Sequence, residues 1–286
     1  MENEANRVEE WDARYSLSEP HVTADGVELY YELRGQGVPL TIVSNYFVVS
    51  VAWRPFTTEL LGDHQLLTYD LRNQGASSMA PGELEAHVSD LESLLDGLAI
   101  EQTYLLGHSV STQVCRDFIL AHPERVKGAI LVAPSLSPWG SRRRAQLLRS
   151  WLGGLERDGA EGLFDLFFPL VFSEGMLDTV GTPAYLALKD RFLALNSQEQ
   201  LRRNIAGALE AERRGGNGLE QIACPVLLTT GDEDFLNSPR SMERMAATMP
   251  DASLRLIERA GHTPYFEEPV LFQRIVAEFI AEQETR

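Results

Sequence analysis

The sequence predicts an α/β fold: a mostly parallel, doubly wound sheet covered by helices on both faces, with a helical cap inserted late in the chain. Short apolar runs alternate with amphipathic segments through residues 21–135 and again through 220–286, which is typical of strands joined by crossover helices. Residues 136–219 instead contain helical patterns without intervening strands. We therefore expect a core built from two segments, an inserted cap, and an N-terminal extension at 1–20.

The composition is that of an ordinary globular protein, with 44% hydrophobic and 23% charged residues. The net charge of −17 argues against nucleic acid and anionic membranes as partners, because binding phosphate requires clustered Lys and Arg. No apolar run reaches the roughly 18 residues of a membrane span, and the acidic N-terminus lacks the apolar centre of a signal peptide. We expect a cytoplasmic protein. Cys115 and Cys224 have no metal-ligand spacing.

The first core segment alternates between short apolar strands and amphipathic helices. The helix at 83–98 shows the pattern well, because its aliphatic residues recur on one side: Val88, Leu91, Leu94, Leu95 and Leu98. In chain order we predict hairpin strands at 21–23 and 27–33, a buried strand at 39–43, a helix at 53–61, a strand at 65–69, the helix at 83–98, a strand at 104–106, a helix at 112–121 and a strand at 129–133.

A Gly-His-Ser-Val-Ser pentapeptide at 107–111 separates a predicted strand from a predicted helix. A serine at the apex of such a turn needs small residues two before and two after it, because the strand and helix backbones nearly touch. Gly107 and Ser111 meet this need, so the pentapeptide is a G-x-S-x-G nucleophile elbow with its last glycine relaxed to serine. The helix start would point N–H groups at negative charge beside Ser109. The alternative is a serine that only caps the helix.

The insert differs from the core in both pattern and charge. We predict helices at 142–155, 161–168, 183–195 and 198–213, and residues 136–220 hold 11 basic and 11 acidic residues. The remainder therefore carries the whole −17. Arg142, Arg143, Arg144 and Arg149 stand near the entrance of the insert. The run Arg142–Arg144 would recognise a substrate carboxylate or dock an acidic carrier protein; the alternative is a solvated helical face.

The second core segment supplies partners for Ser109. We predict strands at 225–230 and 253–257 and helices at 241–249 and 270–282.

A serine hydroxyl needs a base, and the base needs a third group to orient it. Asp234 and His262 each follow a predicted strand, and the carboxyl ends of parallel strands meet at one edge of a sheet. Asp232 competes for the acid role, but Asp234 lies three residues past the turn glycine and has the better reach. We predict Ser109 as nucleophile, His262 as base and Asp234 as the orienting acid.

Taken together, several segments resemble the α/β-hydrolase superfamily of capped serine hydrolases. They are Asp-Gly-Val-Glu-Leu-Tyr-Tyr-Glu at 25–32, Asp-Leu-Arg-Asn-Gln-Gly-Ala-Ser-Ser at 70–78, the pentapeptide at 107–111, Pro-Glu-Arg-Val at 123–126, Gly-Asp-Glu-Asp at 231–234 and Ala-Gly-His at 260–262. The resemblance implies the same three roles for Ser109, Asp234 and His262, and it implies no metal or organic cofactor. A serine at the elbow argues against a haloalkane dehalogenase.

One loop departs from the family pattern. Where the family usually has His-Gly after its third strand, this chain has Ser44 and Asn45, followed by Tyr46 and Phe47. The resemblance implies an oxyanion hole made by the backbone N–H groups of Val110 and Tyr46, with the N–H of Phe47 or the side-chain amide of Asn45 as alternatives. A reorganised loop would weaken ester hydrolysis, since one lost donor costs on the order of 3 kcal/mol. Alternatively, Ser-Asn only replaces the contacts that support the loop.

Aromatic residues on the predicted loops and cap indicate an apolar cavity for an acyl or ring-bearing small molecule. We expect Asn45, Phe47, His108 and Trp139 to contact this substrate. The predicted function is hydrolysis of a small-to-medium carboxylic ester or thioester through an acyl-enzyme. The alternatives are an acyltransferase or cyclase of secondary metabolism with the same triad, and a non-catalytic ligand-binding protein of the same fold.

Overall fold

The computed structural model describes the whole chain except residues 1–13, 17–18, 83, 137–141 and 215–217. Seven strands form one sheet in the order β3-β5-β4-β6-β7-β8-β9, and every neighbouring pair is parallel except β3 with β5. The strands are β3 (Tyr31–Gly35), β4 (Val38–Val43), β5 (His64–Tyr69), β6 (Thr103–His108), β7 (Val126–Val132), β8 (Val226–Gly231) and β9 (Ala252–Ile257). The predicted mostly parallel sheet is confirmed.

The predicted strand at 27–33 is divided between two sheets. Its first part, β2 (Glu28–Leu29), pairs with β1 (His21–Val22) in a separate antiparallel hairpin, whereas its second part is β3. Tyr30 separates them, because its backbone N–H donates to Ser77 Oγ at 3.0 Å and its carbonyl accepts from the N–H of Asp70 at 2.9 Å. The N–H and carbonyl of Tyr30, which would pair with a neighbouring strand if 27–33 were one continuous strand, are thus bonded to residues of the loop at 70–77.

Alternate residues of the central strands fill two separate layers of core, as expected for strands buried on both faces. Leu105, Leu131 and Leu228 point to the face covered by α2 (Leu84–Gly97), α3 (Ser111–Ala121) and α8 (Pro239–Ala246). Leu106, Ile130 and Leu227 point to the opposite face, which is covered by α10 (Pro269–Glu284) and two 3₁₀ helices, η1 (Ser50–Phe56) and η2 (Thr58–Gly62). The sheet is therefore doubly wound.

The predicted helix at 53–61 forms as these two 3₁₀ helices. Pro55 lies inside η1 and lacks the N–H that an α-helix would need there. Thr57, between the two, leaves helical backbone angles at φ −134°, and its hydroxyl donates to the carbonyl of Trp53 at 2.9 Å. The break turns η2 so that the buried Leu60 joins the core under α10.

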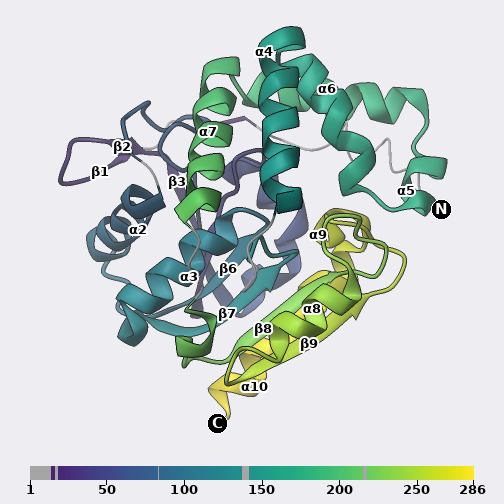
Figure 1. Cartoon of the computed structure of the whole chain (residues 1–286). Helices are drawn as coiled ribbons and strands as arrows, with labels where there is room; N and C mark the ends of the chain where they lie inside the picture. Colours follow the sequence, from purple (N-terminus) through teal and green to yellow (C-terminus); the bar gives the residue numbers. More distant parts are fainter. Residues whose placement is uncertain (1–13, 17–18, 83, 137–141, 215–217) are drawn as a thin grey trace.

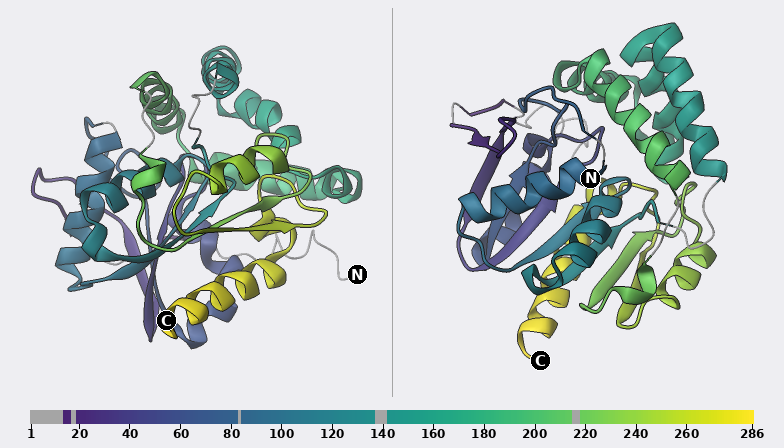
Figure 2. Two further views of the ribbon diagram at one scale, coloured as in Figure 1. Left: turned by 60° about the horizontal axis from the view of Figure 1, so that its bottom comes forward. Right: turned by 60° about the vertical axis from the view of Figure 1, so that its left-hand side comes forward.

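The cap is inserted between β7 and β8 and contains α4 (Arg142–Val171), α5 (Glu174–Thr179), α6 (Thr182–Leu195) and α7 (Gln198–Arg214). The predicted helices at 142–155 and 161–168 are the two halves of α4, which bends where Gly159 has φ +71°. α5 was not predicted; the hydroxyl of Ser173 caps it by accepting from the N–H of Met176. Both views of Figure 2 place the cap helices at one end of the sheet, away from α10.

The cap has an apolar core of its own, made largely of aromatic side chains. Its buried members are Trp151, Leu155, Leu163, Phe164, Phe167, Phe168, Phe192, Leu201 and Ile205. α4 and α7 are packed side by side (Figure 1). Over the described part of the chain, no helix combines the length and apolarity needed to cross a bilayer.

Candidate active site

Ser109 sits at the apex of a tight turn between β6 and α3. Its φ is +55°, a left-handed conformation that a non-glycine residue adopts at a cost and that marks functional turns. A Cβ on Gly107 would come within 2.6 Å of Cys115 Sγ, so glycine is required there. At the second small position, Ser111 is tolerated because its hydroxyl donates to the carbonyl of His108 and accepts from the N–H of His108, at 3.0 and 2.9 Å.

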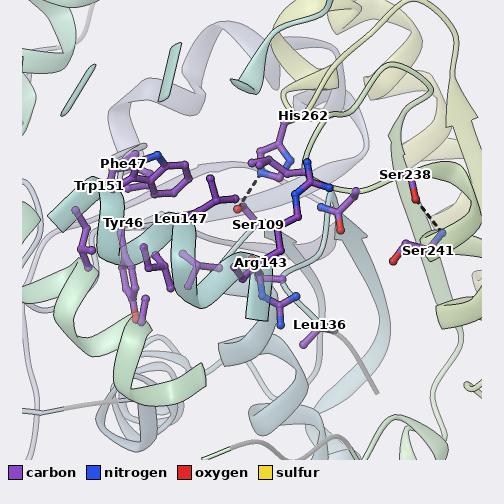
Figure 3. A pocket seen from close by; sticks show the side chains of 18 residues that line it. Tyr46, Phe47, Ser109, Leu136, Arg143, Leu147, Trp151, Ser238, Ser241 and His262 are labelled. Carbon is purple, nitrogen blue, oxygen red and sulfur yellow. Dashed lines mark hydrogen bonds between the residues drawn. The ribbon is translucent and has the colours of Figure 1, made fainter. Parts of the chain in front are cut away.

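Three side chains that are far apart in the sequence form one chain of hydrogen bonds. His262 Nε2 lies 2.9 Å from Ser109 Oγ, and His262 Nδ1 lies 3.0 Å from Asp234 Oδ2 (Figure 3). Asp234 follows β8 and His262 follows β9. Since an ionised carboxylate only accepts hydrogen bonds, Nδ1–H donates to Asp234, which leaves Nε2 to accept from the hydroxyl of Ser109.

Asp234 is held as an ionised acceptor. Its Oδ2 also accepts from the hydroxyl of Thr230 at 2.6 Å, and its Oδ1 accepts from the N–H groups of Leu236 and Asn237 at 2.7 and 3.0 Å. Burial alone would raise the pKa of Asp234, but the charge of His262 and these donors lower it below the ordinary value. The competing Asp232 instead accepts from the N–H of Arg259 at 2.8 Å within the turn.

The loop that carries His262 is tied to the end of cap helix α4. The N–H of His262 donates to the carbonyl of Val171 at 3.0 Å. The carboxylate of Glu267 accepts from the N–H of Gly261 at 2.8 Å with one oxygen and from the N–H of Ser173 at 2.9 Å with the other. Burial raises the pKa of Glu267. Sequence reasoning missed this residue, which bridges the His262 loop and the cap.

The two backbone N–H groups predicted to form an oxyanion hole are those of Tyr46 and Val110. Within the described residues, neither the N–H of Tyr46 nor that of Val110 has a hydrogen-bond acceptor, and both residues line the cavity that contains Ser109. The N–H of Phe47, the first alternative, donates instead to the side-chain oxygen of Asn45 at 2.8 Å. This geometry favours Tyr46 over Phe47 as the first donor.

The structure gives Asn45 and His108 supporting contacts, so their contact with substrate, and the alternative that the Asn45 amide serves as an oxyanion donor, stay predictions. The Asn45 amide donates to His108 Nδ1 at 2.6 Å, and neither residue lines the cavity. With Nδ1 accepting, His108 Nε2–H donates to the carbonyl of His262 at 2.9 Å. Burial, then the nearby His262, lower the pKa of His108 to about 3, so this ring stays neutral. Asn45 and His108 support the loops around the site.

A cavity of ≈ 220 Å³ lies between the core and the cap, with Ser109 and His262 in its wall. Figure 3 shows two sides to it: Tyr46, Phe47, Leu147 and Trp151 lie on one side of Ser109, and Ser238 and Ser241 on the other. Phe47 is fixed by its ring contacts, with centres 5.3 Å from Phe167 and 5.7 Å from Trp151. The predicted contact Trp139 lies outside the described residues.

Only part of the predicted basic run, Arg142–Arg144, lines this cavity. Arg143 and Arg144 line it, whereas Arg142 is exposed and does not. Docking of an acidic carrier protein on this run stays a prediction. Among the described residues, no group of three or more His, Cys, Asp and Glu side chains is arranged to hold a metal ion.

Comparison with known proteins shows which family and which solved structures this chain is similar to. Residues 35–274 match the model of a family described as the alpha/beta hydrolase family. A candidate 2-succinyl-6-hydroxy-2,4-cyclohexadiene-1-carboxylate synthase of Bacillus subtilis is 29% identical over 245 residues, covering 79% of this chain and 84% of that protein. A candidate carbamate hydrolase RutD of Azorhizobium caulinodans is 24% identical over 280 residues, covering 92% and 98%. The fold of a thermophilic esterase from Thermogutta terrifontis is similar, with a TM-score of 0.80, 24% identity and coverage of 93% and 98%.

Proposed function

This chain belongs to the alpha/beta hydrolase family, and we propose that it is a serine hydrolase that cleaves a small-to-medium carboxylic ester or thioester through an acyl-enzyme on Ser109. The observation that carries the proposal is the continuous hydrogen-bond chain from Asp234 through His262 to Ser109, which ends in the wall of a cavity between the core and the cap. That arrangement supplies a nucleophile, a base in the required tautomer, and room for a substrate.

The reaction begins when Ser109 Oγ attacks the substrate carbonyl while His262 Nε2 takes the hydroxyl proton. The negative charge that develops on the carbonyl oxygen is stabilised by the N–H groups of Tyr46 and Val110. Asp234 holds the ring of His262 in place and stabilises its protonated form. The imidazolium then gives its proton to the departing alcohol or thiol, and the acyl group remains on Ser109.

Deacylation uses the same groups in reverse. Water enters the position of the leaving group, His262 takes its proton, and the resulting hydroxide attacks the acyl carbonyl. The second tetrahedral oxyanion occupies the same pair of N–H groups. Collapse of this intermediate returns the proton to Ser109 Oγ and releases the carboxylic acid.

The cavity under the cap also supports a second candidate, in which the acyl group passes to an alcohol or amine, or closes a ring. Among the relatives, one is named as a candidate synthase and another as a candidate carbamate hydrolase, so the relatives are not all named as hydrolases. Product analysis with an added alcohol or amine separates the candidates. Free acid as the sole product supports hydrolysis, and a transferred ester or amide supports the transferase.

The proposal is tested by turnover of p-nitrophenyl esters of increasing acyl length with wild type and Ser109→Ala. We expect release of nitrophenol by the wild type and background rates for the variant. A protein that binds these esters equally well with and without Ser109, and turns none of them over, is a ligand-binding member of the fold, and the proposal is then wrong.

A further inference from the structure

Arg143 places a positive charge in the wall of the cavity without an acidic partner. Within the described part of the chain, no Asp or Glu forms an ion pair with it. Its Nη2 donates to the carbonyl of Phe235 at 2.7 Å, and its guanidinium carbon lies 4.6 Å from the centre of the Phe235 ring. These contacts orient the exposed guanidinium of Arg143 at the edge of the cavity, and neither contact supplies a negative charge.

The contact with Phe235 locates this charge on the polar side of the cavity. Phe235 directly follows Asp234 and precedes three lining residues, Leu236, Asn237 and Ser238. Ser238 lies across Ser109 from Phe47 and Trp151 (Figure 3). A molecule bound against Ser109 would therefore meet aromatic rings on one side of its carbonyl, and hydroxyl groups with a guanidinium on the other.

We propose that the substrate carries an anionic group, a carboxylate or a group of similar charge and shape, and that Arg143 binds it. This inference rests on the proposed function and narrows its substrate class. A chain with net charge −17 repels anionic ligands at long range, so retaining one needs a local cation at the site. A guanidinium matches a carboxylate with two parallel N–H donors. Within the described residues, only one of the five N–H donors of Arg143 is used, by the carbonyl of Phe235, so the others are left for a ligand.

Arg143 is distinguished from its neighbours by position. Arg142 precedes it in α4 and both side chains are exposed, but Arg142 does not line the cavity. Arg142→Met therefore removes the same charge from the same helix and serves as the matched control. Arg144 also lines the cavity but is half-buried and has further contacts. For this reason the proposal is assigned to Arg143.

The test compares matched esters that differ in one charge. On the acyl side, p-nitrophenyl hemiglutarate is compared with p-nitrophenyl pentanoate; on the leaving-group side, a p-nitrophenyl butyrate bearing a ring carboxylate is compared with the unsubstituted ester. We expect kcat/KM to favour the charged ester of at least one pair by about tenfold, since hydrogen bonds to charged groups reach that scale. The pair that responds identifies the side of the carbonyl that carries the anion.

Arg143→Met should abolish this preference by lowering kcat/KM for the charged ester about tenfold more than for its neutral partner. Arg143→Lys should keep part of the preference, and Arg142→Met should keep all of it. Equal kcat/KM for both members of both pairs, or a preference that survives Arg143→Met, would overturn the proposal.

A second readout does not need turnover: calorimetric binding of monomethyl glutarate and methyl pentanoate to Ser109→Ala, with and without Arg143→Met. Tighter binding of the charged ester that depends on Arg143 supports the inference even if the wild type hydrolyses nothing, in which case the proposed function alone fails. Equal binding of the two, or binding of neither, contradicts the inference.

Discussion

The core side and the cap side of the cavity are built differently. On the core side, Ser109, His262 and Asp234 are fixed by directional hydrogen bonds of 2.6 to 3.2 Å and by a backbone turn in the left-handed region. On the cap side, Leu147 and Trp151 line the cavity through apolar contacts within an aromatic cluster. Directional contacts hold reacting atoms in one geometry, whereas apolar packing tolerates changes of shape. We infer from this difference that, in the proposed reaction, the core positions the reacting groups and the cap selects the substrate.

The largest effect is expected from removing the nucleophile. Ser109→Ala should lower kcat on p-nitrophenyl esters by about 10⁴-fold or more, because the base and the oxyanion donors then have no covalent chemistry to assist. Thermal unfolding of the variant should stay close to wild type, since alanine keeps the Cβ and with it the same positive φ. A variant that keeps a tenth of the wild-type rate would mean that Ser109 does not carry the reaction.

Asp234→Asn should reduce kcat by about 10³- to 10⁴-fold. An amide that donates toward His262 Nδ1 stabilises the wrong tautomer of the ring, and it cannot stabilise the imidazolium. Asp232→Asn is the matched control, because Asp232 contacts the N–H of Arg259 rather than the histidine. Similar losses in both variants would assign the effect to the turn instead of to the triad.

Glu267→Gln should lower kcat by about three- to tenfold with little change in KM. Its carboxylate accepts from Gly261 and Ser173, so the amide leaves one of these N–H groups without an acceptor and loosens the loop that carries His262. The neighbouring Glu268, whose side chain has no hydrogen bond in the described part of the chain, provides the control variant Glu268→Gln. A loss of stability without a change in kcat would make Glu267 purely structural.

On the cap side, Leu147→Trp should shift the preferred acyl length toward shorter esters. The larger ring takes volume from the apolar side of a cavity of ≈ 220 Å³, and each methylene that no longer fits is worth about 1–3 kcal/mol in discrimination. Turnover of p-nitrophenyl acetate should remain within about twofold of wild type. An equal fall for all chain lengths would show that the cap takes part in catalysis as well as in selection.

The last prediction concerns stability instead of activity, namely its dependence on pH. Burial, with a contribution from Arg72, lowers the pKa of His87 to about 3, so between that pH and about 6.5 the unfolded chain takes up a proton that the folded chain does not. Stability from this residue is therefore complete above that window and falls by about 1.4 kcal/mol per pH unit within it. His87→Leu should remove this contribution, so that the unfolding free energy changes by about 1.4 kcal/mol less per pH unit within the window, the effect of one proton. Urea unfolding at several pH values measures this slope.

The features that could be predicted from the sequence are those that a short segment determines without contacts to distant residues. The need for glycine at position 107 follows from the close approach of strand and helix. The placement of Ser109, Asp234 and His262 at one edge follows from the alternation of strands and helices. Each of these depends on local spacing, and the family model that matches residues 35–274 confirms the resemblance from which the fold was predicted.

What could not be predicted depends on contacts between distant segments. Asn45 and His108 are hydrogen-bonded although 63 residues separate them in the sequence, and Glu267 and Ser173 are hydrogen-bonded across 94 residues. The residues around each position give no sign of these contacts. The contact of Asn45 with His108 depends on the register that sets β4 beside β6, with Val43 opposite Gly107. Such a register becomes visible only once the sheet is assembled.

The most direct test of the central claim is covalent labelling with a p-nitrophenyl alkylphosphonate, followed by mass spectrometry of the intact protein and its peptides. The account predicts one phosphonate per chain, located on Ser109, with labelling strongly slowed in His262→Ala and absent in Ser109→Ala. Wild-type protein that stays unlabelled, or a label that maps to a different residue, would contradict the claim that Asp234, His262 and Ser109 act together as an activated nucleophile.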